Sequence, residues 1–374
     1  MRQTDKPMRQ EARKRPKILY AASTQSHLVR FHQPYVDALW ESCDVMLMAN
    51  GQDVDFPVGF EKSLFSPANL GAVLRIRRVL KRERFDGVIL NTSLAAFLIR
   101  AAMIGMRRRP RVLNIVHGYL FADPPRGLRE RLLLRCEKLT AKQTDRIAVM
   151  NAEDLEITRR HRLCRGEVRL MRGMGFRMPC AGQESEHPVS PREQLSVSPD
   201  DWLLTFVGEL SKRKNQIFLI RALERLRCEG LPVRLMLVGE GTERETLEAE
   251  VGRLGLAQSV FLVGNREPVF PYLSAADLYV SASRSEGLPF NLMEAMACGL
   301  PVIASDVKGQ NDLLQASPGS LYPPDDMDAF CRAIRSAVEK GRRGCGVVSY
   351  PTLEAYRLEA VFAENLQLMK GSLE

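Results

Sequence analysis

SASRSEGLPFNLMEAMACGLPVIAS, residues 281–305, joins the end of a strand to a Gly-Leu-Pro-Phe turn and the start of a helix. The apolar run LYVSAS at 278–283 predicts a short buried strand. Pro289 suits the first helical position, because its missing N–H would have no intrahelical partner there. The free N–H groups at such a start, together with the positive end of the helix dipole, favour a pyrophosphate.

Two acids flank this turn. Glu286 stands just before the helix, and Glu294 lies about one turn inside it. Both carboxylates can therefore face one ligand that also touches the helix tip. An ionised carboxylate only accepts hydrogen bonds, so each can hold two neighbouring sugar hydroxyls. On these residues alone, a pair of solvated acids near a helix N-terminus is an equal alternative.

Residues 203–315 resemble the nucleotide-binding half of the retaining glycosyltransferases of family 4, which have the GT-B fold. Their signature, E-G-x-P followed by four residues and a second E, stands here as EGLPFNLME, and the downstream ACGLPVIASDVKGQNDLL is also similar to that family. The resemblance implies that Glu286 contacts the transferred sugar and that Glu294 contacts the ribose of the nucleotide. It also implies that the turn between them lines the nucleotide-sugar site: Gly287, Leu288, Pro289 and Phe290.

Strand and helix patterns alternate through both halves of the 374-residue chain, which is too long for one ordinary core. Such alternation argues for parallel sheets covered by helices, with ligands beyond the carboxyl ends of the strands. With the resemblance, the fold class is α/β of the GT-B type, two doubly wound Rossmann-like domains facing across a cleft. We expect an N-terminal acceptor-side domain at 1–180, a linker at 181–200, a nucleotide-sugar-binding domain at 201–350, and a last helix at 351–374 that crosses back to the first domain.

FVGELSKRKNQ follows the first strand of the second half. Gly208 permits close approach of the backbone, and Lys214 begins the next helix, where its charge can reach a phosphate. The resemblance also places a pyrophosphate-binding lysine at Lys214. Many relatives carry Arg where this chain has Glu209, so the second phosphate-binding cation is unassigned, with Arg213 and Lys212 as candidates.

Two further strand ends complete the nucleotide-sugar side. LVGEGTERETL carries Gly239 and Gly241, which alone indicate only a tight turn. In this position, facing the other strand ends, the turn is expected to line the site. The family holds the nucleotide base largely through backbone groups of the loop that stands here as FLVGNREPV. Asn265 and Arg266 are therefore candidates, with an ordinary surface loop as an equal alternative.

The first half contributes IVHGYLF, with His117 at a strand end. A single histidine is more often a structural hydrogen-bonding residue than a catalyst. HGYLF is, however, similar to the HGFHF-type segment of a bacterial capsule and exopolysaccharide subgroup, although Leu120 replaces the second histidine. The resemblance places His117 near the reacting carbon of the donor sugar, and Gly118 and Tyr119 on the acceptor side.

STQSHLVRFHQPY, residues 23–35, is similar to the first loop of that subgroup, which faces the acceptor. His27 and Ser23 are the acceptor-side candidates. His32 is expected to cap or pack the helix that it begins. TDRIAVMNAEDLEI and RGMGF complete a resemblance that spans about residues 17–345.

These resemblances imply a retaining glycosyltransferase that moves a hexose or N-acetylhexosamine from a nucleotide-diphosphate sugar, UDP-linked in our interpretation, to a lipid-linked, capsular or exopolysaccharide glycan. Its catalytic residues would be His117, Glu286 and Lys214, with Lys214 and helix N–H groups stabilising the departing diphosphate. We expect no cofactor and no metal, because we identify no D-x-D carboxylate pair near a strand end in either half and because cations and a helix dipole can replace Mg²⁺ at the diphosphate. A GT-B nucleotide-sugar epimerase or phosphorylase, and a non-catalytic GT-B binding protein, are the alternatives.

Charge is divided unevenly between the halves. Residues 1–180 hold 34 Lys+Arg against 18 Asp+Glu, whereas residues 181–374 hold 20 against 27. The excess gathers in RIRRVLKRER, RRRPR and RGLRERLLLRCEKLTAK, and an anionic membrane surface fits these cations. Nucleic acid does not, because no recognition motif accompanies them. Three leucines of the last run recur at helical spacing and either face a membrane or cover the sheet, as most such helices do: Leu128, Leu132 and Leu139.

No run of about 18 apolar residues is present, and the basic N-terminus lacks the apolar core of a secretory signal. We therefore expect a cytoplasmic protein that binds peripherally to the inner face of the cell membrane. The eight cysteines are scattered without a CxxC pair, which favours reduced thiols over disulfides or a zinc site. The sequence does not indicate an oligomeric state.

Overall fold

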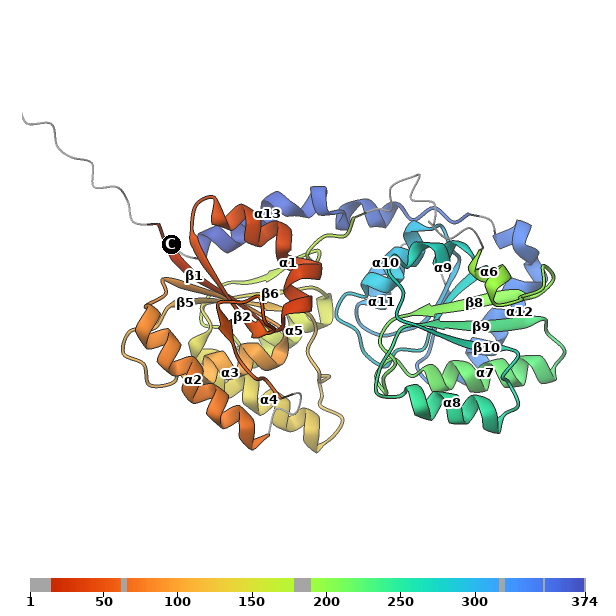
Figure 1. The fold of residues 1–374 in the computed structure, drawn as a ribbon, viewed down its shortest axis with the longest axis horizontal. Helices are drawn as coiled ribbons and strands as arrows, with labels where there is room; N and C mark the ends of the chain where they lie inside the picture. The colour runs from red at the N-terminus through yellow and green to blue at the C-terminus, as the bar shows by residue number, and fades with distance from the viewer. Residues whose placement is uncertain (1–14, 62–65, 178–189, 316–319, 346, 373–374) are drawn as a thin grey trace, which may run out of the picture.

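The computed structural model describes residues 15–61, 66–177, 190–315, 320–345 and 347–372, which form two α/β domains side by side (Figure 1). In both domains every paired strand is parallel to its neighbour. The alternation of strands and helices that the sequence predicts is therefore present in each half.

The N-terminal domain is built on a seven-stranded sheet in the order β3-β2-β1-β4-β5-β6-β7. Strand β4 is buried at every residue, as expected for a parallel sheet that is covered on both faces. The strand order reverses between β1 and β4, which is where doubly wound folds place their ligands. The strands are β1 Lys17–Thr24, β2 Asp44–Asn50, β3 Phe56–Pro57, β4 Gly87–Asn91, β5 Arg111–Val116, β6 Arg146–Val149 and β7 Val168–Leu170.

Helices cover both faces of this sheet, with α2, α3 and α4 on one face and α1 on the other (Figure 1). A buried ion pair joins α3 to α4, because Arg100 donates two hydrogen bonds to Glu137 at 3.0 and 2.9 Å. The helices are α1 Gln25–Trp40, α2 Pro67–Glu83, α3 Ser93–Met103, α4 Leu128–Thr140 and α5 Ala152–His161, and the 3₁₀ turn η1 spans Ala141–Gln143.

The C-terminal domain has a six-stranded sheet in the order β10-β9-β8-β11-β12-β13. Its strands are β8 Trp202–Val207, β9 Val233–Val238, β10 Val260–Gly264, β11 Leu278–Ser281, β12 Val302–Ser305 and β13 Ser320–Tyr322. Helices α7 and α8 cover one face, and α9 and α10 the other (Figure 1). The helices are α7 Gln216–Cys228, α8 Arg244–Arg253, α9 Phe270–Ser274, α10 Phe290–Ala297, α11 Gln310–Leu314 and α12 Met327–Cys345.

The expected linker is only partly described, since residues 181–189 lie outside the described ranges. The remainder contains a short helix, α6 Pro191–Gln194, that the non-periodic sequence did not predict. Ser190 caps it by accepting a hydrogen bond from the N–H of Arg192. The Arg192 guanidinium lies 2.9 Å from the carboxylate of Asp277, so this part of the chain is fixed to the C-terminal domain.

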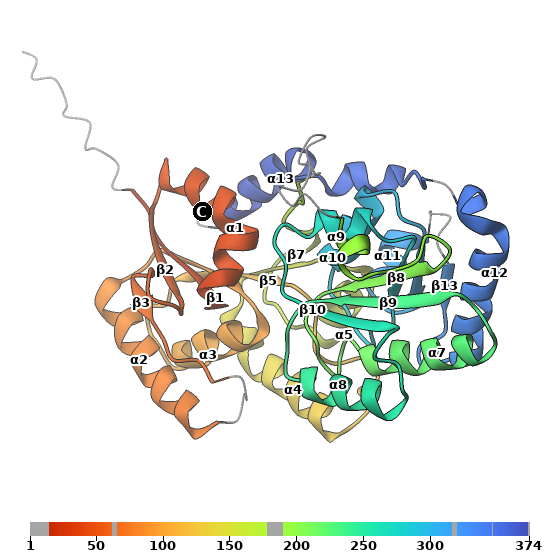
Figure 2. The same cartoon turned by 45° about the vertical axis from the view of Figure 1, so that its right-hand side comes forward.

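The end of the chain returns to the N-terminal domain. After the 3₁₀ turn η2 Pro351–Tyr356, helix α13 Leu358–Gly371 lies along α1 (Figures 1 and 2). Asn365 donates hydrogen bonds to the Tyr35 hydroxyl at 3.0 Å and to the carbonyl of Gly173 at 2.9 Å. Phe362 stacks on Tyr35 with ring centroids 5.0 Å apart. The last helix is thus part of the first domain's packing.

Candidate active site

A cavity of about 400 Å³ lies at the carboxyl ends of β8, β9 and β10, against the turn that leads into α10. Ten residues that the sequence indicated for the nucleotide-sugar site lie in its wall: Gly208, Lys214, Gly239, Asn265, Arg266, Glu286, Leu288, Pro289, Phe290 and Glu294. Arg213, Gly241 and Gly287 lie outside this wall. Arg30 and Phe31 on α1 close the cavity from the other side, so it lies between the two domains.

Glycines allow the strand ends to pack closely beneath this cavity. A Cβ atom on Gly239 would lie 2.0 Å from the carbonyl oxygen of Gly208, and the φ of Gly239 is +146°. The N–H of Gly239 donates to the carbonyl of Gly264 at 2.8 Å. A Cβ on Gly241 would lie 2.1 Å from the Leu210 carbonyl. Both glycines of the GEG turn are therefore required for close packing of the backbone, and of the two only Gly239 lines the cavity.

A buried ion pair dominates one wall. The Lys214 ammonium lies 2.6 Å from one carboxylate oxygen of Glu286, and the Arg213 guanidinium lies 2.9 Å from the other. Lys214 and Glu286 are both nearly inaccessible to solvent, whereas Lys212 is exposed. Arg213, not Lys212, is thus the second cation at Glu286, although it does not itself line the cavity. Lys214 precedes α7 by two residues instead of opening it.

The pKa values of this pair follow from its surroundings. Burial by itself raises the pKa of Glu286, but Lys214 and Arg213 outweigh burial and hold the pKa below its usual value. Burial lowers the pKa of Lys214, and the attraction of Glu286 offsets only part of that decrease. The opposite charges are therefore held in a site with little water, where they act more strongly on a ligand than they would in solution.

Helix α10 starts one residue later than the sequence predicts. Pro289 is its N-cap and Phe290 its first residue, because the φ and ψ of Pro289 are extended rather than helical. Glu294 follows on the same helix and lies 3.6 Å from the Arg30 guanidinium of α1. Burial raises the pKa of Glu294. Arg30 is a cavity residue that the sequence analysis missed, and no motif distinguished it from its neighbours.

The turns that carry the two predicted sugar-binding segments touch each other across the domains. A Cβ atom on Gly287 would lie 1.6 Å from the carbonyl oxygen of His117, and one on Gly118 would lie 2.7 Å from the Cα of Gly287. Only glycine at both positions allows this contact between backbones. It sets His117 beside Glu286, so the two predicted catalytic segments form one site.

A second contact between the domains involves residues that the sequence analysis did not single out. Lys308 donates to the Asp154 carboxylate at 2.7 Å and to the Tyr119 carbonyl at 3.0 Å. Asn151 donates to the Gly287 carbonyl at 3.1 Å. Lys308 and Asn151 lie in segments quoted for the family resemblance, but nothing in either segment showed that they would meet. Together these bonds fix the first domain against the EGLP turn.

The residues predicted for the acceptor side lie in different surroundings. Ser23 shares a hydrogen bond of 2.6 Å with the Thr92 hydroxyl. The Tyr119 side chain lies in the domain core, with its hydroxyl 3.0 Å from that of Thr158, and so cannot reach an acceptor in the cleft. His27 lies near the start of α1, next to His117. His32 does not begin that helix, contrary to the prediction, because α1 starts seven residues earlier at Gln25.

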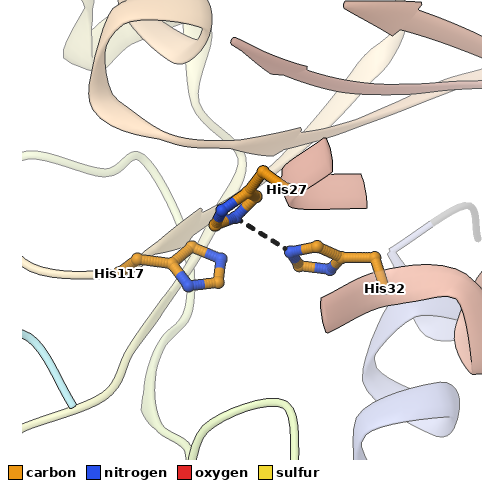
Figure 3. A group of neighbouring side chains, drawn as sticks. All are labelled: His27, His32 and His117. Atoms are coloured by element: carbon orange, nitrogen blue, oxygen red, sulfur yellow. Dashed lines mark hydrogen bonds between the residues drawn. The ribbon is translucent and has the colours of Figure 1, made fainter. Parts of the chain in front are cut away.

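The three histidines form a cluster with ring centroids 4.7 to 5.2 Å apart (Figure 3). His27 and His32 share a hydrogen bond of 3.2 Å between their Nε2 atoms, and Nδ1 of His32 lies 2.9 Å from the Tyr20 hydroxyl. Burial lowers the pKa of His27 to about 4 and lowers the pKa values of the other two. All three imidazoles are therefore neutral at pH 7.

One pair of acids with the spacing of a metal motif stands outside the cavity. Asp53 and Asp55 follow β2 in the sequence Asp-Val-Asp, so the expectation that no D-x-D pair stands near a strand end is wrong. Asp55 accepts a hydrogen bond from the N–H of Leu47 at 2.7 Å, and Asp53 accepts one from the Gln25 side chain at 3.2 Å. Neither carboxylate lines the cavity, so this pair is a loop support rather than part of the nucleotide-sugar site.

Comparison with known proteins covers both domains. Residues 19–173 match the family described as "Glycosyl transferase 4-like domain", and residues 202–340 match "Glycosyl transferases group 1". EpsD of Bacillus subtilis (strain 168), which is named as a glycosyltransferase, is 30% identical over 342 residues, covering 87% of this chain and 88% of EpsD. The chain belongs to this family of glycosyltransferases.

Other proteins similar to this glycosyltransferase support the same family and the same fold. An Escherichia coli protein named UDP-Gal:alpha-D-GlcNAc-diphosphoundecaprenol alpha-1,3-galactosyltransferase is 25% identical over 272 residues, or 71% of this chain and 70% of the relative. The solved structure of Anabaena HepE in complex with UDP and glucose has a TM-score of 0.75 at 19% identity, covering 95% of this chain and all of HepE. Sucrose-phosphate synthase from Thermosynechococcus elongatus has a TM-score of 0.73 at 22% identity, covering 96% and 98% of the two chains. The predicted GT-B fold is confirmed.

Proposed function

We propose that this glycosyltransferase is a retaining enzyme of family 4. It would transfer a hexose or N-acetylhexosamine from a UDP-sugar to a lipid-linked, capsular or exopolysaccharide glycan. The observation that carries the proposal is the Lys214–Glu286 ion pair in the wall of the cavity between the domains, beside the N-terminus of α10. HepE, which shares the fold, was solved with UDP and glucose, and the name of the Escherichia coli relative gives a UDP-sugar donor and a diphosphoundecaprenol-linked acceptor.

Lys214 is the residue that we assign to the leaving diphosphate. An ammonium has three N–H donors, so Lys214 can keep Glu286 and also hold a phosphate oxygen. The negative charge on the departing UDP grows in the transition state, and a cation fixed beside it favours that state over the ground state. The free N–H groups at the start of α10 would act in the same direction. The proposal needs no metal at the diphosphate.

Glu286 and His117 are assigned to the transferred sugar. The contact between the backbones of His117 and Gly287 places both side chains at the boundary between donor and acceptor domains. Glu286 would accept hydrogen bonds from sugar hydroxyls, and the neutral His117 would act beside the reacting carbon. Glu294, deeper along α10, would accept the ribose hydroxyls.

A donor screen tests the proposal. The protein is incubated with UDP-sugars and polyprenyl-diphosphate-linked sugars, and UDP release, product mass and the anomeric configuration of the product are measured. We expect acceptor-dependent UDP release and a product with the donor's configuration. An inverted product would contradict retention, an isomerised donor would indicate an epimerase, and donor binding without any product would indicate a binding protein.

We also propose that the enzyme attaches peripherally to the anionic cytoplasmic face of the membrane through α4. The three leucines indicated by the sequence do not cover the sheet, which corrects the alternative raised there. Leu128, Leu132 and Leu139 are 83%, 40% and 71% exposed, while Leu134 and Cys136 pack inward. Exposed cations share the helix: Arg129, Arg131, Arg135 and Lys138.

A basic cavity elsewhere in the N-terminal domain supports binding to an anionic surface, although none of its residues belongs to α4. It measures about 770 Å³ and lies at the amino ends of β4 and β5, away from the nucleotide-sugar residues. Its lining contains one acid, Asp86, and seven cations: Arg77, Lys81, Arg84, Arg107, Arg108, Arg109 and Arg111. Each cation near an anionic leaflet contributes about 1 kcal/mol. Across the described parts of the chain, no helix is both long and apolar enough to cross a bilayer.

A further inference from the structure

The histidine cluster has the ligand set of a metal site. His27 and His32 come from α1, and His117 follows β5 directly. Their ring nitrogens lie within 4.8 Å of one another, and Figure 3 shows the three rings gathered around one point. The separation of 3.2 Å between Nε2 of His27 and Nε2 of His32 is close to the value of about 3.3 Å that two nitrogens 2.0–2.1 Å from one tetrahedral Zn²⁺ would have.

Hydrogen bonding accounts for only part of the cluster. Nε2 of His117 is buried and has no hydrogen-bond partner, and the same is true of Oδ1 of Asn91. Buried polar atoms of this kind are uncommon and destabilising, because they have lost water without gaining another partner. The Nε2 of His117 belongs to the cluster, so an added ligand there would satisfy it.

The surroundings suit metal ligation. A histidine that binds a metal through Nε2 usually donates its Nδ1–H to a fixed partner, which sets the tautomer. Nδ1 of His32 already lies 2.9 Å from the Tyr20 hydroxyl. Tyr20 could then donate its own proton to the unpaired oxygen of Asn91, a residue whose side chain interacts with that of Tyr20. This arrangement would give both unpaired atoms a partner.

We propose that His27, His32 and His117 bind one divalent cation that prefers nitrogen ligands, of which Zn²⁺ is the probe. Each histidine would supply one ring nitrogen, and a tetrahedral ion would have a fourth position for water or for a hydroxyl of the acceptor side. The site is separate from the diphosphate position at Lys214, so it differs from the Mg²⁺ sites of metal-dependent transferases. It is also independent of the Asp53-Val54-Asp55 loop.

The position of the cluster gives the metal a regulatory effect, and this step rests on the proposed function. Nε2 of His117 is buried without a hydrogen-bond partner, and the proposed reaction uses His117 beside the sugar. A cation bound to His117 removes that side chain from the reaction. Zn²⁺ at the cluster is therefore an inhibitor of transfer, and its removal restores activity.

Metal binding is measured first, without turnover. The chelator-treated full-length protein is titrated with Zn²⁺ by calorimetry and with Co²⁺ by visible absorption. We expect one site per chain and a Co²⁺ spectrum without a thiolate charge-transfer band. His27→Ala, His32→Ala and His117→Ala each weaken Zn²⁺ binding at least tenfold, and Tyr20→Phe weakens it about 10- to 100-fold.

Matched variants keep this test informative. His161→Ala removes a histidine that pairs with Asp123 outside the cluster, and it is expected to bind Zn²⁺ as the unmodified protein does. His→Gln variants and circular dichroism separate loss of the ligand from loss of the fold. Unchanged Zn²⁺ affinity in folded His27 and His117 variants, or no binding at micromolar Zn²⁺, would overturn the site.

Activity is measured second. We expect Zn²⁺ to inhibit transfer by the unmodified protein and EDTA to reverse the inhibition. Binding at the cluster without inhibition would overturn the regulatory step and the role of His117 in transfer, but leave the metal site in place. If the unmodified protein transfers sugar but shows no Zn²⁺ binding in the titration and no inhibition by added Zn²⁺, the metal site is overturned and the proposed function stays in place.

Discussion

The ammonium of Lys308, in the C-terminal domain, lies 2.7 Å from the carboxylate of Asp154, in the N-terminal domain. Both side chains are almost fully buried, at 6% and 0% exposure. Asp154 also accepts hydrogen bonds from Asn151 and from the N–H of Tyr119. The pair thus connects the C-terminal domain to the loop that carries His117.

Breaking this pair should loosen the two domains. In Lys308→Ala, Asp154 remains buried without its cation, which typically costs about 3–5 kcal/mol. We expect a lower melting temperature and a larger radius of gyration in X-ray scattering. Arg225→Ala breaks an exposed pair with Asp328 and should change neither measurement appreciably. An unchanged melting temperature in Lys308→Ala would show that the contact does not hold the domains.

Lys214→Ala should slow the chemical step. Loss of one preorganised donor to a developing anion typically lowers the rate about a hundredfold to a thousandfold. The measurement is the single-turnover rate at saturating UDP-sugar, because it separates chemistry from binding. Lys212→Ala removes an exposed lysine two residues away and is the control. A Lys214→Ala protein that melts earlier but turns over normally would assign the residue to stability alone.

UDP affinity should depend on Glu294 and on pH. At pH values below its pKa, the Glu294 carboxyl is protonated and loses its negative charge. Each hydrogen bond from a ribose hydroxyl to the charged carboxylate contributes about 1.5–3 kcal/mol to binding. Burial raises that pKa, so the affinity should begin to fall at a higher pH than for an exposed glutamate. Glu294→Gln should bind UDP weakly at every pH. Equal affinities for UDP in the variant and the unmodified protein would contradict the ribose assignment.

Gly239→Ala should destabilise the protein and abolish UDP binding. Its Cβ would meet the Gly208 carbonyl at 2.0 Å, and its φ of +146° is unfavourable for alanine. We expect a loss of more than about 1 kcal/mol in the free energy of unfolding. Gly252→Ala, near the end of α8 with no atom within 4 Å of the new Cβ, should instead stabilise by about 0.4–1 kcal/mol. Denaturant titration compares the two, and wild-type stability in Gly239→Ala would refute the packing argument.

Membrane attachment should depend on α4. The triple variant Leu128→Ser, Leu132→Ser, Leu139→Ser removes the exposed apolar groups without touching the sheet. In liposome sedimentation we expect the unmodified protein to bind anionic vesicles, to lose binding as salt increases, and to lose most of it in the triple variant. Leu70→Ser, an exposed leucine on α2, is the control. Equal binding to neutral vesicles would contradict the electrostatic part of this proposal.

Much of the fold could be predicted because parallel strands and their helices leave strong local patterns. The apolar run before Glu286 forms strand β11, and the apolar run before Gly208 forms strand β8. Since parallel strands share one carboxyl edge, residues that follow different strands were expected to meet there. The cavity wall brings those residues together. The exact start of α10 could not be fixed, since Pro289 suits both an N-cap and a first helical position.

The remaining features depend on contacts between distant segments. Arg30, Asp154 and Lys308 gain their roles from partners more than a hundred residues away, which no local pattern reveals. The position of Tyr119 shortly after a strand predicts a cleft residue, yet its side chain is buried next to Thr158. Leu128, Leu132 and Leu139 of α4 have the spacing of residues that face a core. Only the packed structure shows that Leu134 and Cys136 face the core instead.

The return of α13 to the first domain has a consequence for how this protein is made. Asn365 donates a hydrogen bond to the Tyr35 hydroxyl, so the packing around Tyr35 is completed only after residue 365 has been synthesised. The N-terminal domain therefore completes its packing only after α13 has been synthesised, later than first domains that fold during synthesis commonly do. Until then Tyr35 lacks both the hydrogen bond from Asn365 and the stacked ring of Phe362. Completion of the first domain thus depends on a side chain 330 residues further along the chain.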